Sequence, residues 1–220
     1  MKYTSVQNVI FDLDGTLIDS SPGILASLTS ALESSGITPN QPLDSSLIGP
    51  PLREMILSLV DKPTEAQFAY MTEAFKTHYD AEGFKSSLPY PGVSLMLKRL
   101  LANHVRLHIV TNKRARPTRL ILSHLNWTSC FLNVYSPDSI VPPSASKAEL
   151  LGAFLLDTGI IPEQCIYIGD RVEDWHSARS NHVRFVWARW GFSGDDLRFD
   201  DNSICLAVPD ADLLSAHLSS

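Results

Sequence analysis

Five short apolar runs, separated by segments of helical periodicity, constrain the fold of this chain more than any other feature. They fall at residues 6–11, 105–110, 133–135, 165–168 and 183–187, and most are β-branched or aromatic. Their apolar character is continuous rather than alternating, which is typical of strands in a parallel sheet covered on both faces. The alternation of strands and helices predicts a doubly wound α/β fold with a mainly parallel, Rossmann-like sheet and right-handed crossovers. A weaker strand at 204–208 and a short helix at 211–218 would complete it.

One stretch interrupts this alternation and reads as helices only, from the first strand to Val105. Ser20 or Ser21 can cap a helix that has Pro22 in its first turn. Thr64 and Gln67 have capping-box spacing ahead of a second helix, and residues 52–60 form a shorter one. Two prolines and a glycine in residues 88–92 indicate a hinge. We therefore expect a core domain of residues 1–17 and 88–220 and a small helical domain of residues 18–87.

Composition excludes several classes of function. The formal net charge is −6 and no dense run of Lys or Arg appears, so nucleic acid is not an expected partner. No apolar stretch approaches transmembrane length, so no membrane association is expected. The three cysteines are scattered without a C-x-x-C pair, which argues against disulfides and zinc. These features fit a protein of the reducing cytoplasm.

Polar side chains follow the predicted strands at the points where the strands end. In a doubly wound sheet, ligands bind outside these carboxyl ends. Gly15 indicates that the chain turns directly after the first strand, which would aim two nearby acids at one cavity. Capping-box spacing between Ser146 and Glu149 places a lysine at a helix start. The residues at the strand ends are Asp12 and Asp14, Thr111-Asn112-Lys113, Lys147, and Asp170 with Glu173 and Asp174.

This set of side chains suits phosphoryl transfer. A cluster of acids repels an anionic substrate unless a hard cation lies within it, and oxygen ligands of this kind suit Mg²⁺. One carboxylate can then act as a nucleophile that forms an aspartyl-phosphate. A second can protonate the leaving oxygen and later deprotonate water. Lys147 and Thr111 could stabilise charge on the transferred oxygens.

An apolar strand leading into D-x-D-G-T resembles the haloacid-dehalogenase-like phosphatases, and the order and spacing of the later motifs match that family as well. The resemblance implies that Asp12 is the nucleophile and a metal ligand. It implies that Asp14 is the general acid/base and lends its backbone carbonyl to the metal. It further implies that the helical domain is a mobile cap. The other implied roles are a phosphoryl contact for Thr111 and the Asn112 N–H, charge neutralisation for Lys147, metal binding for Asp170, and contact with Lys147 or a metal-bound water for Asp174.

Smaller features resemble the phosphoglycolate phosphatase-like branch of this family, namely Ile48-Gly49-Pro50-Pro51-Leu52, Tyr90-Pro91-Gly92-Val93 and Trp190-Gly191-Phe192. In that branch the residue after Pro-Pro-Leu faces the entrance, so Arg53 is a candidate for binding a substrate carboxylate or phosphate. Its alternative is a solvated helix charge. The helix after Asp174 departs from the family pattern, and we expect Asn181 to replace glycine as its left-handed C-cap.

The expected function is a Mg²⁺-dependent phosphatase that hydrolyses a small phosphorylated metabolite, such as a phosphoglycolate-like phosphomonoester. A phosphosugar mutase of the same family is one alternative, and a non-catalytic phosphate-binding regulatory domain is the other. Intact Asp12, Asp14, Lys147 and Asp170 count against the second alternative. The protein is expected to be a monomer or a homodimer.

Overall fold

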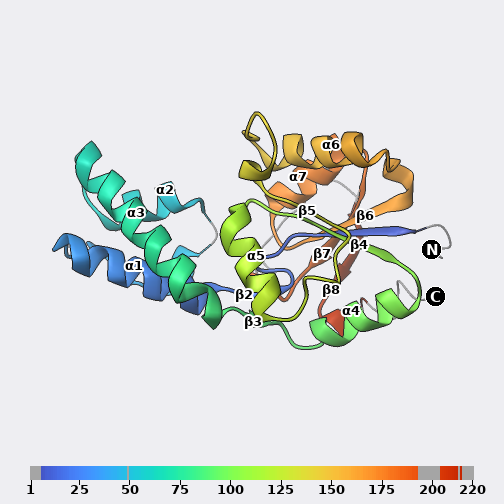
Figure 1. The fold of residues 1–220 in the computed structure, drawn as a ribbon, viewed down its shortest axis with the longest axis horizontal. Helices are drawn as coiled ribbons and strands as arrows, with labels where there is room; N and C mark the ends of the chain where they lie inside the picture. The colour runs from blue at the N-terminus through green and yellow to red at the C-terminus, as the bar shows by residue number, and fades with distance from the viewer. Residues whose placement is uncertain (1–5, 49, 193–203, 213, 215–220) are drawn as a thin grey trace. The chain divides into compact units, whose positions relative to one another are not determined.

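The computed structural model describes residues 6–48, 50–192, 204–212 and 214. The chain divides into two compact units, which are coloured by residue number in Figure 1. The core unit comprises Met1–Asp19 and Pro89–Ser220, and the helical unit comprises Ser20–Leu88. Among the described residues, no helix is long and apolar enough to cross a membrane.

The core unit is built on a sheet of six described strands in the order β5-β4-β1-β6-β7-β8, and every neighbouring pair is parallel. The strands are β1 (Asn8–Phe11), β4 (Arg106–Val110), β5 (Asn133–Tyr135), β6 (Cys165–Gly169), β7 (Arg184–Ala188) and β8 (Ile204–Val208). When only the six strands of this sheet are numbered along the chain, their order is 3-2-1-4-5-6, which is a doubly wound order. The predicted fold class is therefore confirmed, and the winding reverses between β1 and β6.

The central strands are buried on both faces, as their continuous apolar sequences predict. All four residues of β1 and all five of β6 are buried. Figure 1 shows α6 (Lys147–Thr158) and α7 (Val172–Ser180) on one face of the sheet and α4 (Val93–Ala102) on the other. The fourth helix of this unit, α5 (Ala115–His124), follows β4. Burying the apolar side chains between these layers is the main favourable contribution to folding.

The helical unit is held together by α1 (Ser21–Ser35) and α3 (Glu65–Ala81), which lie side by side in Figure 1. The rings of Phe75 and Tyr79 on α3 stack with centroids 5.7 Å apart. The capping box predicted for α3 is confirmed, because Gln67 N–H donates to Thr64 Oγ1 and Thr64 N–H donates to Gln67 Oε1. The remaining elements are α2 (Leu52–Leu59) and the 3₁₀ turns η1 (Ser45–Leu47) and η2 (Gly83–Ser86).

Of two predictions about chain segments near the helical unit, one is wrong and the other is confirmed only in part. The stretch between the first strand and Val105 is not purely helical, because β2 (Ile18–Asp19) and β3 (Leu88–Pro89) form a two-stranded sheet. Strands of two residues are too short to leave a periodic apolar pattern. Ser20 occupies the N-cap position of α1, but its buried hydroxyl makes no capping hydrogen bond.

The expected left-handed C-cap of α7 is also misplaced by one residue. Asn181 has φ −104°, and His182 adopts the left-handed conformation with φ 57°. The Asn181 amide instead donates to the carbonyls of Ala148 and Ser177 at 2.9 and 2.8 Å. These two hydrogen bonds hold the Asn181 side chain against the backbone of Ala148 and Ser177. The left-handed turn after α7 is therefore made by His182. The helix predicted at 211–218 lies largely outside the described residues.

Candidate active site

The candidate active site lies at the carboxyl ends of β1, β4 and β6, next to the switch point of the sheet. Asp12 directly follows β1, and Asp170 directly follows β6. Phe11 pairs with Ile109 on one side and Ile168 on the other, so the three strands end at nearly the same level. This register brings side chains from distant parts of the sequence to one edge.

Lys147 is the first residue of α6 and is almost completely buried. Ser146 caps the helix by accepting a hydrogen bond from Glu149 N–H at 3.2 Å, which confirms the predicted helix start. Lys147 Nζ lies 2.5 Å from Asp174 Oδ1 and 3.0 Å from Asp12 Oδ2. Burial alone would lower the pKa of Lys147, but the two carboxylates raise it well above its ordinary value. The two carboxylates therefore favour the charged form of the Lys147 ammonium.

Asp174 uses both carboxylate oxygens within the protein. Oδ1 contacts Lys147, and Oδ2 accepts hydrogen bonds from Asp170 N–H at 3.1 Å and Arg171 N–H at 3.0 Å. The Tyr167 hydroxyl lies 3.4 Å from Oδ1 and donates to Val110 O at 2.8 Å. Asp174 thus ties the loop after β6 to Lys147.

Asp12 has one carboxylate oxygen without a partner among the described residues. Its Oδ1 is buried and forms no hydrogen bond within the described chain, whereas Oδ2 faces Lys147. Burial raises the pKa of Asp12 to about 6, against the lowering effect of Lys147 and with repulsion from Asp174 and Asp14. An unpaired buried oxygen of this kind is costly unless another group contacts it.

Asp170 is held from two sides by loops that are remote in sequence. Thr16 Oγ1 donates to its Oδ1 at 3.2 Å, and Phe192 N–H donates to its Oδ2 at 3.0 Å. Trp190 Nε1 in turn donates to Thr16 O at 2.9 Å. The carboxylate is fully buried, and burial followed by repulsion from Asp174 and Asp12 raises the pKa of Asp170 well above its ordinary value.

Two glycines allow the backbone to approach Asp170 this closely. A Cβ at Gly15, where φ is +81°, would lie 2.4 Å from Asp170 Oδ2. A Cβ at Gly191 would lie 2.3 Å from both Asp170 Cβ and Gly15 O. The turn predicted at Gly15 is present, and its left-handed conformation is one that glycine adopts without strain.

A divalent cation fits this set of residues. One carboxylate oxygen from each of Asp12, Asp170 and Asp174 lies within 4.8 Å of the other two. Of these three buried carboxylates, Asp12 and Asp174 pair with Lys147, and Asp12 Oδ1 has no partner within the described chain. Hard cations such as Mg²⁺ take oxygen ligands of this kind, and their charge offsets the repulsion among carboxylates.

The structure places the other predicted site residues as follows. Thr111 is buried at the end of β4, where its hydroxyl accepts a hydrogen bond from Lys113 N–H at 3.2 Å. The Asn112 side chain donates to Glu173 Oε1 at 3.0 Å. Arg53 belongs to the helical unit, where its guanidinium lies over the Phe68 ring, 4.6 Å from the centroid.

One residue that the sequence placed at a strand end was given no role there, namely Lys113. Lys113 Nζ lies 3.1 Å from both carboxylate oxygens of Asp14. The sequence contained a signal for it, since Lys113 follows Thr111 by two residues at a strand end. The contact itself depends on the reach of a long side chain, which no spacing rule gives.

A doubly wound α/β fold with buried acids and a lysine at its switch point defines the class of α/β enzymes that bind ligands at strand ends. The chain belongs to the haloacid dehalogenase-like hydrolase family, whose model matches residues 9–188. This result confirms the resemblance drawn from the sequence motifs.

Individual relatives agree with this assignment. The chain is 32% identical over 187 residues to phosphoglycolate phosphatase of Xylella fastidiosa, covering 84% of this chain and 81% of that one. It is 32% identical over 195 residues to tyrosine-protein kinase PtkA of Mycobacterium tuberculosis, covering 87% of this chain and 65% of PtkA. The chain therefore spans just under two thirds of the length of PtkA. A crystal structure of a predicted phosphoglycolate phosphatase from Haemophilus somnus superposes with a TM-score of 0.81 at 25% identity, covering 96% and 98% of the two chains.

Proposed function

We propose that the protein is a Mg²⁺-dependent phosphatase that hydrolyses a small phosphorylated metabolite through an aspartyl-phosphate intermediate. The observation that carries this proposal is the environment of Asp12, whose Oδ2 faces Lys147 while its buried Oδ1 has no partner in the described chain. The similarity of the chain to phosphoglycolate phosphatases supports a phosphoglycolate-like phosphomonoester as the substrate class.

In the proposed reaction, Asp12 attacks the phosphorus atom and the bond from phosphorus to the ester oxygen breaks. Asp14 gives a proton to the departing oxygen, so the alcohol leaves neutral. Asp14 then takes a proton from a water molecule, which attacks the aspartyl-phosphate. Inorganic phosphate is released, and Asp12 is regenerated as a carboxylate.

The other residues would stabilise charge and hold the reactants in position. Lys147 faces Asp12 at 3.0 Å and would neutralise the phosphoryl oxygens, and Thr111 with the Asn112 N–H would hydrogen-bond them. Asp12, Asp170 and the Asp14 carbonyl would hold Mg²⁺, which when bound would offset the charge of the acids and of the phosphoryl group. We place Asp174 at the edge of this metal site, where its bonds to Lys147 and the loop after β6 favour a positioning role.

The helical unit is proposed to act as a cap, with boundaries near residues 18 and 87. By resemblance to the phosphoglycolate phosphatase-like branch, Arg53 in this cap would contact a carboxylate or phosphate of the substrate. Its guanidinium lies over the Phe68 ring, 4.6 Å from the centroid, and a guanidinium can bind a carboxylate or phosphate through its N–H groups. Closing a cap over a phosphoryl-transfer site would exclude water until the aspartyl-phosphate has formed.

The test is release of phosphate from p-nitrophenyl phosphate and from a panel of phosphoglycolate, sugar phosphates, nucleotides and pyrophosphate, with Mg²⁺ or with EDTA. We expect wild-type turnover that needs Mg²⁺ and is lost in Asp12→Asn. Asp157→Asn is the matched control, since that carboxylate only accepts a hydrogen bond from the Tyr135 hydroxyl at 3.0 Å.

Two results would contradict the proposal. Unchanged turnover in Asp12→Asn would remove the nucleophile assignment. No release from any ester by the wild-type protein would favour a phosphate-binding domain, whereas an isomerised product without phosphate release would indicate a mutase.

A further inference from the structure

A partly buried ion pair joins Asp14 to Lys113 beside the candidate active site. Lys113 Nζ lies 3.1 Å from Oδ1 and 3.1 Å from Oδ2 of Asp14, so one ammonium spans both oxygens. The side chain of Lys113 is only 8% exposed and that of Asp14 is 24% exposed. Lys113 N–H also donates to Thr111 Oγ1, which holds the backbone of the lysine against the end of β4.

Attraction between the two charges does not by itself make such a pair stabilising. Burying an ammonium and a carboxylate costs several kcal/mol each, and their mutual attraction only about offsets that cost. Lys113 also begins a basic segment that continues with Arg114, Arg116 and Arg119, and the first turn of α5 contains no acidic residue. Positive charge at a helix N-terminus is unfavourable. The acid at this helix start comes from another segment, since Asp138 Oδ1 accepts a hydrogen bond from Ala115 N–H at 2.8 Å.

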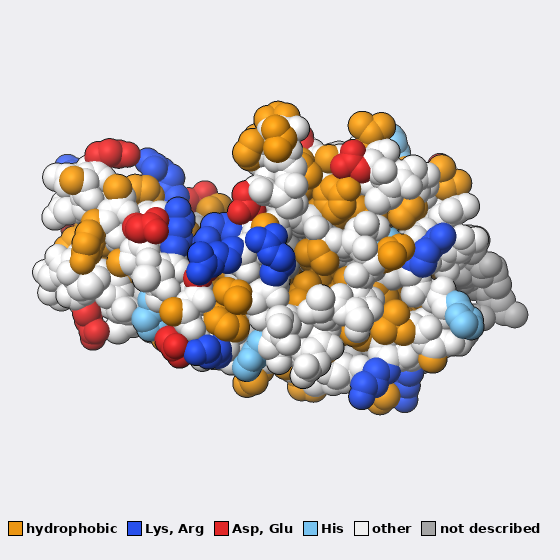
Figure 2. All heavy atoms as spheres, viewed as in Figure 1, with side chains coloured by type: hydrophobic (Ala, Val, Ile, Leu, Met, Phe, Trp, Pro, Cys, Tyr) orange, Lys and Arg blue, Asp and Glu red, His pale blue; other side chains and the backbone are white. Residues whose placement is uncertain are grey.

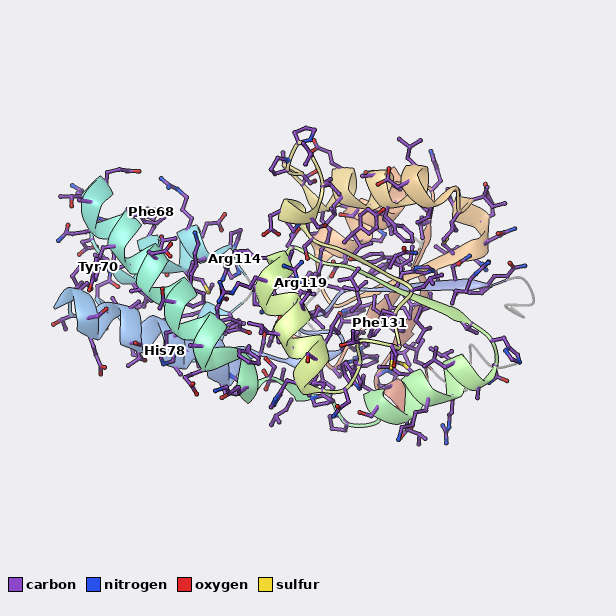
Figure 3. The ribbon with its side chains drawn as sticks, viewed as in Figure 1. Phe68, Tyr70, His78, Arg114, Arg119 and Phe131 are labelled. Atoms are coloured by element: carbon purple, nitrogen blue, oxygen red, sulfur yellow. The ribbon has the colours of Figure 1, made fainter. Side chains whose placement is uncertain are left out.

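The surface view shows where this charge lies. Lys and Arg side chains gather over α5 in Figure 2, and Figure 3 labels Arg114 and Arg119 there.

The proposed reaction fixes where Lys113 would lie relative to a substrate. An in-line displacement puts the leaving oxygen opposite Asp12. Asp14 must come within about 3 Å of that oxygen to protonate it. Because Lys113 Nζ is 3.1 Å from both Asp14 oxygens, it would lie within about 6 Å of the leaving oxygen. A negative group one or two carbons from the ester oxygen would then be within reach of the ammonium.

We propose that Lys113 is a specificity-determining residue that recognises a negative charge on the leaving group. The preferred substrates would be phosphomonoesters whose alcohol carries a carboxylate or a second phosphate close to the ester oxygen. This inference rests on the proposed phosphatase function, and it adds Lys113 to Arg53 as a source of selectivity. It differs from a role in which Lys113 only positions Asp14, because positioning would affect all esters alike.

The test compares phosphoglycolate with n-propyl phosphate, an ester of similar size whose leaving group is uncharged. In Lys113→Met we expect kcat/KM for phosphoglycolate to fall by about 30-fold or more, mainly through KM, since a charge-assisted hydrogen bond is lost. For n-propyl phosphate we expect a change of less than about threefold. Lys113→Arg keeps the charge and should retain most of the preference. Arg119→Gln, which removes an exposed charge from the same helix, is the matched control and should leave the ratio unchanged.

A binding measurement separates failure of this inference from failure of the proposed function. Calorimetry with Mg²⁺ gives the affinities of both esters for the Asp12→Asn protein, with and without Lys113→Met. Tighter binding of phosphoglycolate that disappears with Lys113→Met supports the inference even if no ester is turned over. Equal losses for the two esters would assign Lys113 to positioning and overturn it, as would an unchanged ratio. Circular dichroism and urea unfolding of each variant would show that the protein remains folded.

Discussion

The carboxylate of Asp174 holds the ammonium group of Lys147, with Nζ 2.5 Å from Oδ1 inside a fully buried pair. The same ammonium reaches Asp12 Oδ2, so the position of Lys147 beside the proposed nucleophile depends on Asp174. Asp174 on α7, Lys147 and Asp12 are therefore linked through shared contacts. A substitution at Asp174 is expected to shift the ammonium group that faces Asp12 at the end of β1.

Replacing Asp174 should cost both stability and activity. Asp174→Asn leaves Lys147 with one carboxylate partner instead of two and alters the acceptors of two backbone N–H groups. Removing one partner of a buried pair typically costs about 3–5 kcal/mol, so we expect the free energy of unfolding to fall by about 3 kcal/mol. Urea unfolding, monitored by circular dichroism, measures this free energy of unfolding. Asp157→Asn should change it by less than about 1 kcal/mol, because that side chain is at the surface. A loss for Asp174→Asn no larger than this control would contradict the prediction.

The close approach of Gly15 to Asp170 should make Gly15→Ala far more damaging to the site than a comparable change elsewhere. Gly159→Ala is the matched control, because Gly159 has φ +65° but no atom within 4 Å of an added Cβ. Both variants should lose about 1–2 kcal/mol of stability from the left-handed conformation. Only Gly15→Ala should also lose Mn²⁺ binding, measured by electron paramagnetic resonance, and phosphatase activity. Retained Mn²⁺ affinity in Gly15→Ala would show that Asp170 does not need this backbone approach.

His108 should make the protein sensitive to mild acid. It is buried between Asn8 and Asn133, with Nε2 3.2 Å from Asn8 Oδ1 and Nδ1 3.1 Å from Asn133 Nδ2. Burial, followed by repulsion from Arg106, lowers the pKa of His108 to about 4. The unfolded chain therefore binds a proton near pH 6.5 that the folded chain excludes, and stability is lost as the pH falls from about 6.5 towards 4.

The size of this effect can be measured against a variant that does not titrate. Between pH 7 and pH 5 the contribution of His108 amounts to a loss of about 2 kcal/mol in the free energy of unfolding. His108→Gln should be less stable at pH 7 but should show a smaller loss over the same interval. Urea titrations at several pH values give the difference between the two slopes. Parallel slopes would rule out His108 as the source.

Arg53 allows a test of substrate contact against simple packing. Its stacking on Phe68 is worth about 0.5–1 kcal/mol at an exposed site, so Arg53→Gln should change the free energy of unfolding by no more than that. If Arg53 contacts the substrate, KM for phosphoglycolate should rise at least about tenfold, since a charge-assisted hydrogen bond is lost. Phe68→Leu removes the ring but keeps the charge, and it should affect KM much less. Similar KM values for Arg53→Gln and wild type would leave Arg53 as a solvated helix charge.

Much of the fold could be predicted from local sequence patterns. The central strands are buried on both faces, and their continuous apolar runs located them to within two residues at each end. The start of α6 followed from the spacing of Ser146 and Glu149, which set Lys147 at its first position. These features depend on neighbours in sequence, where periodicity and capping rules apply directly.

The parts that could not be predicted depend on contacts between distant segments. The pairing of Lys113 with Asp14 joins residues 99 positions apart, and the bond from Phe192 N–H to Asp170 depends on a loop with no periodic pattern. The choice of His182 rather than Asn181 for the left-handed turn was decided by the bonds of the Asn181 amide to Ala148 and Ser177. Each outcome was set by tertiary geometry that one sequence does not contain.

The bond from Trp190 Nε1 to Thr16 O spans 174 positions in the chain and has a consequence for protein synthesis. During translation the loop that contains Thr16 emerges from the ribosome well before the segment that contains Trp190. β1 likewise lacks one of its two neighbours until β6 has been made. The loop after β1 therefore stays without this bond until 174 further residues have been made, and pairing at such long sequence separation is intrinsically slow.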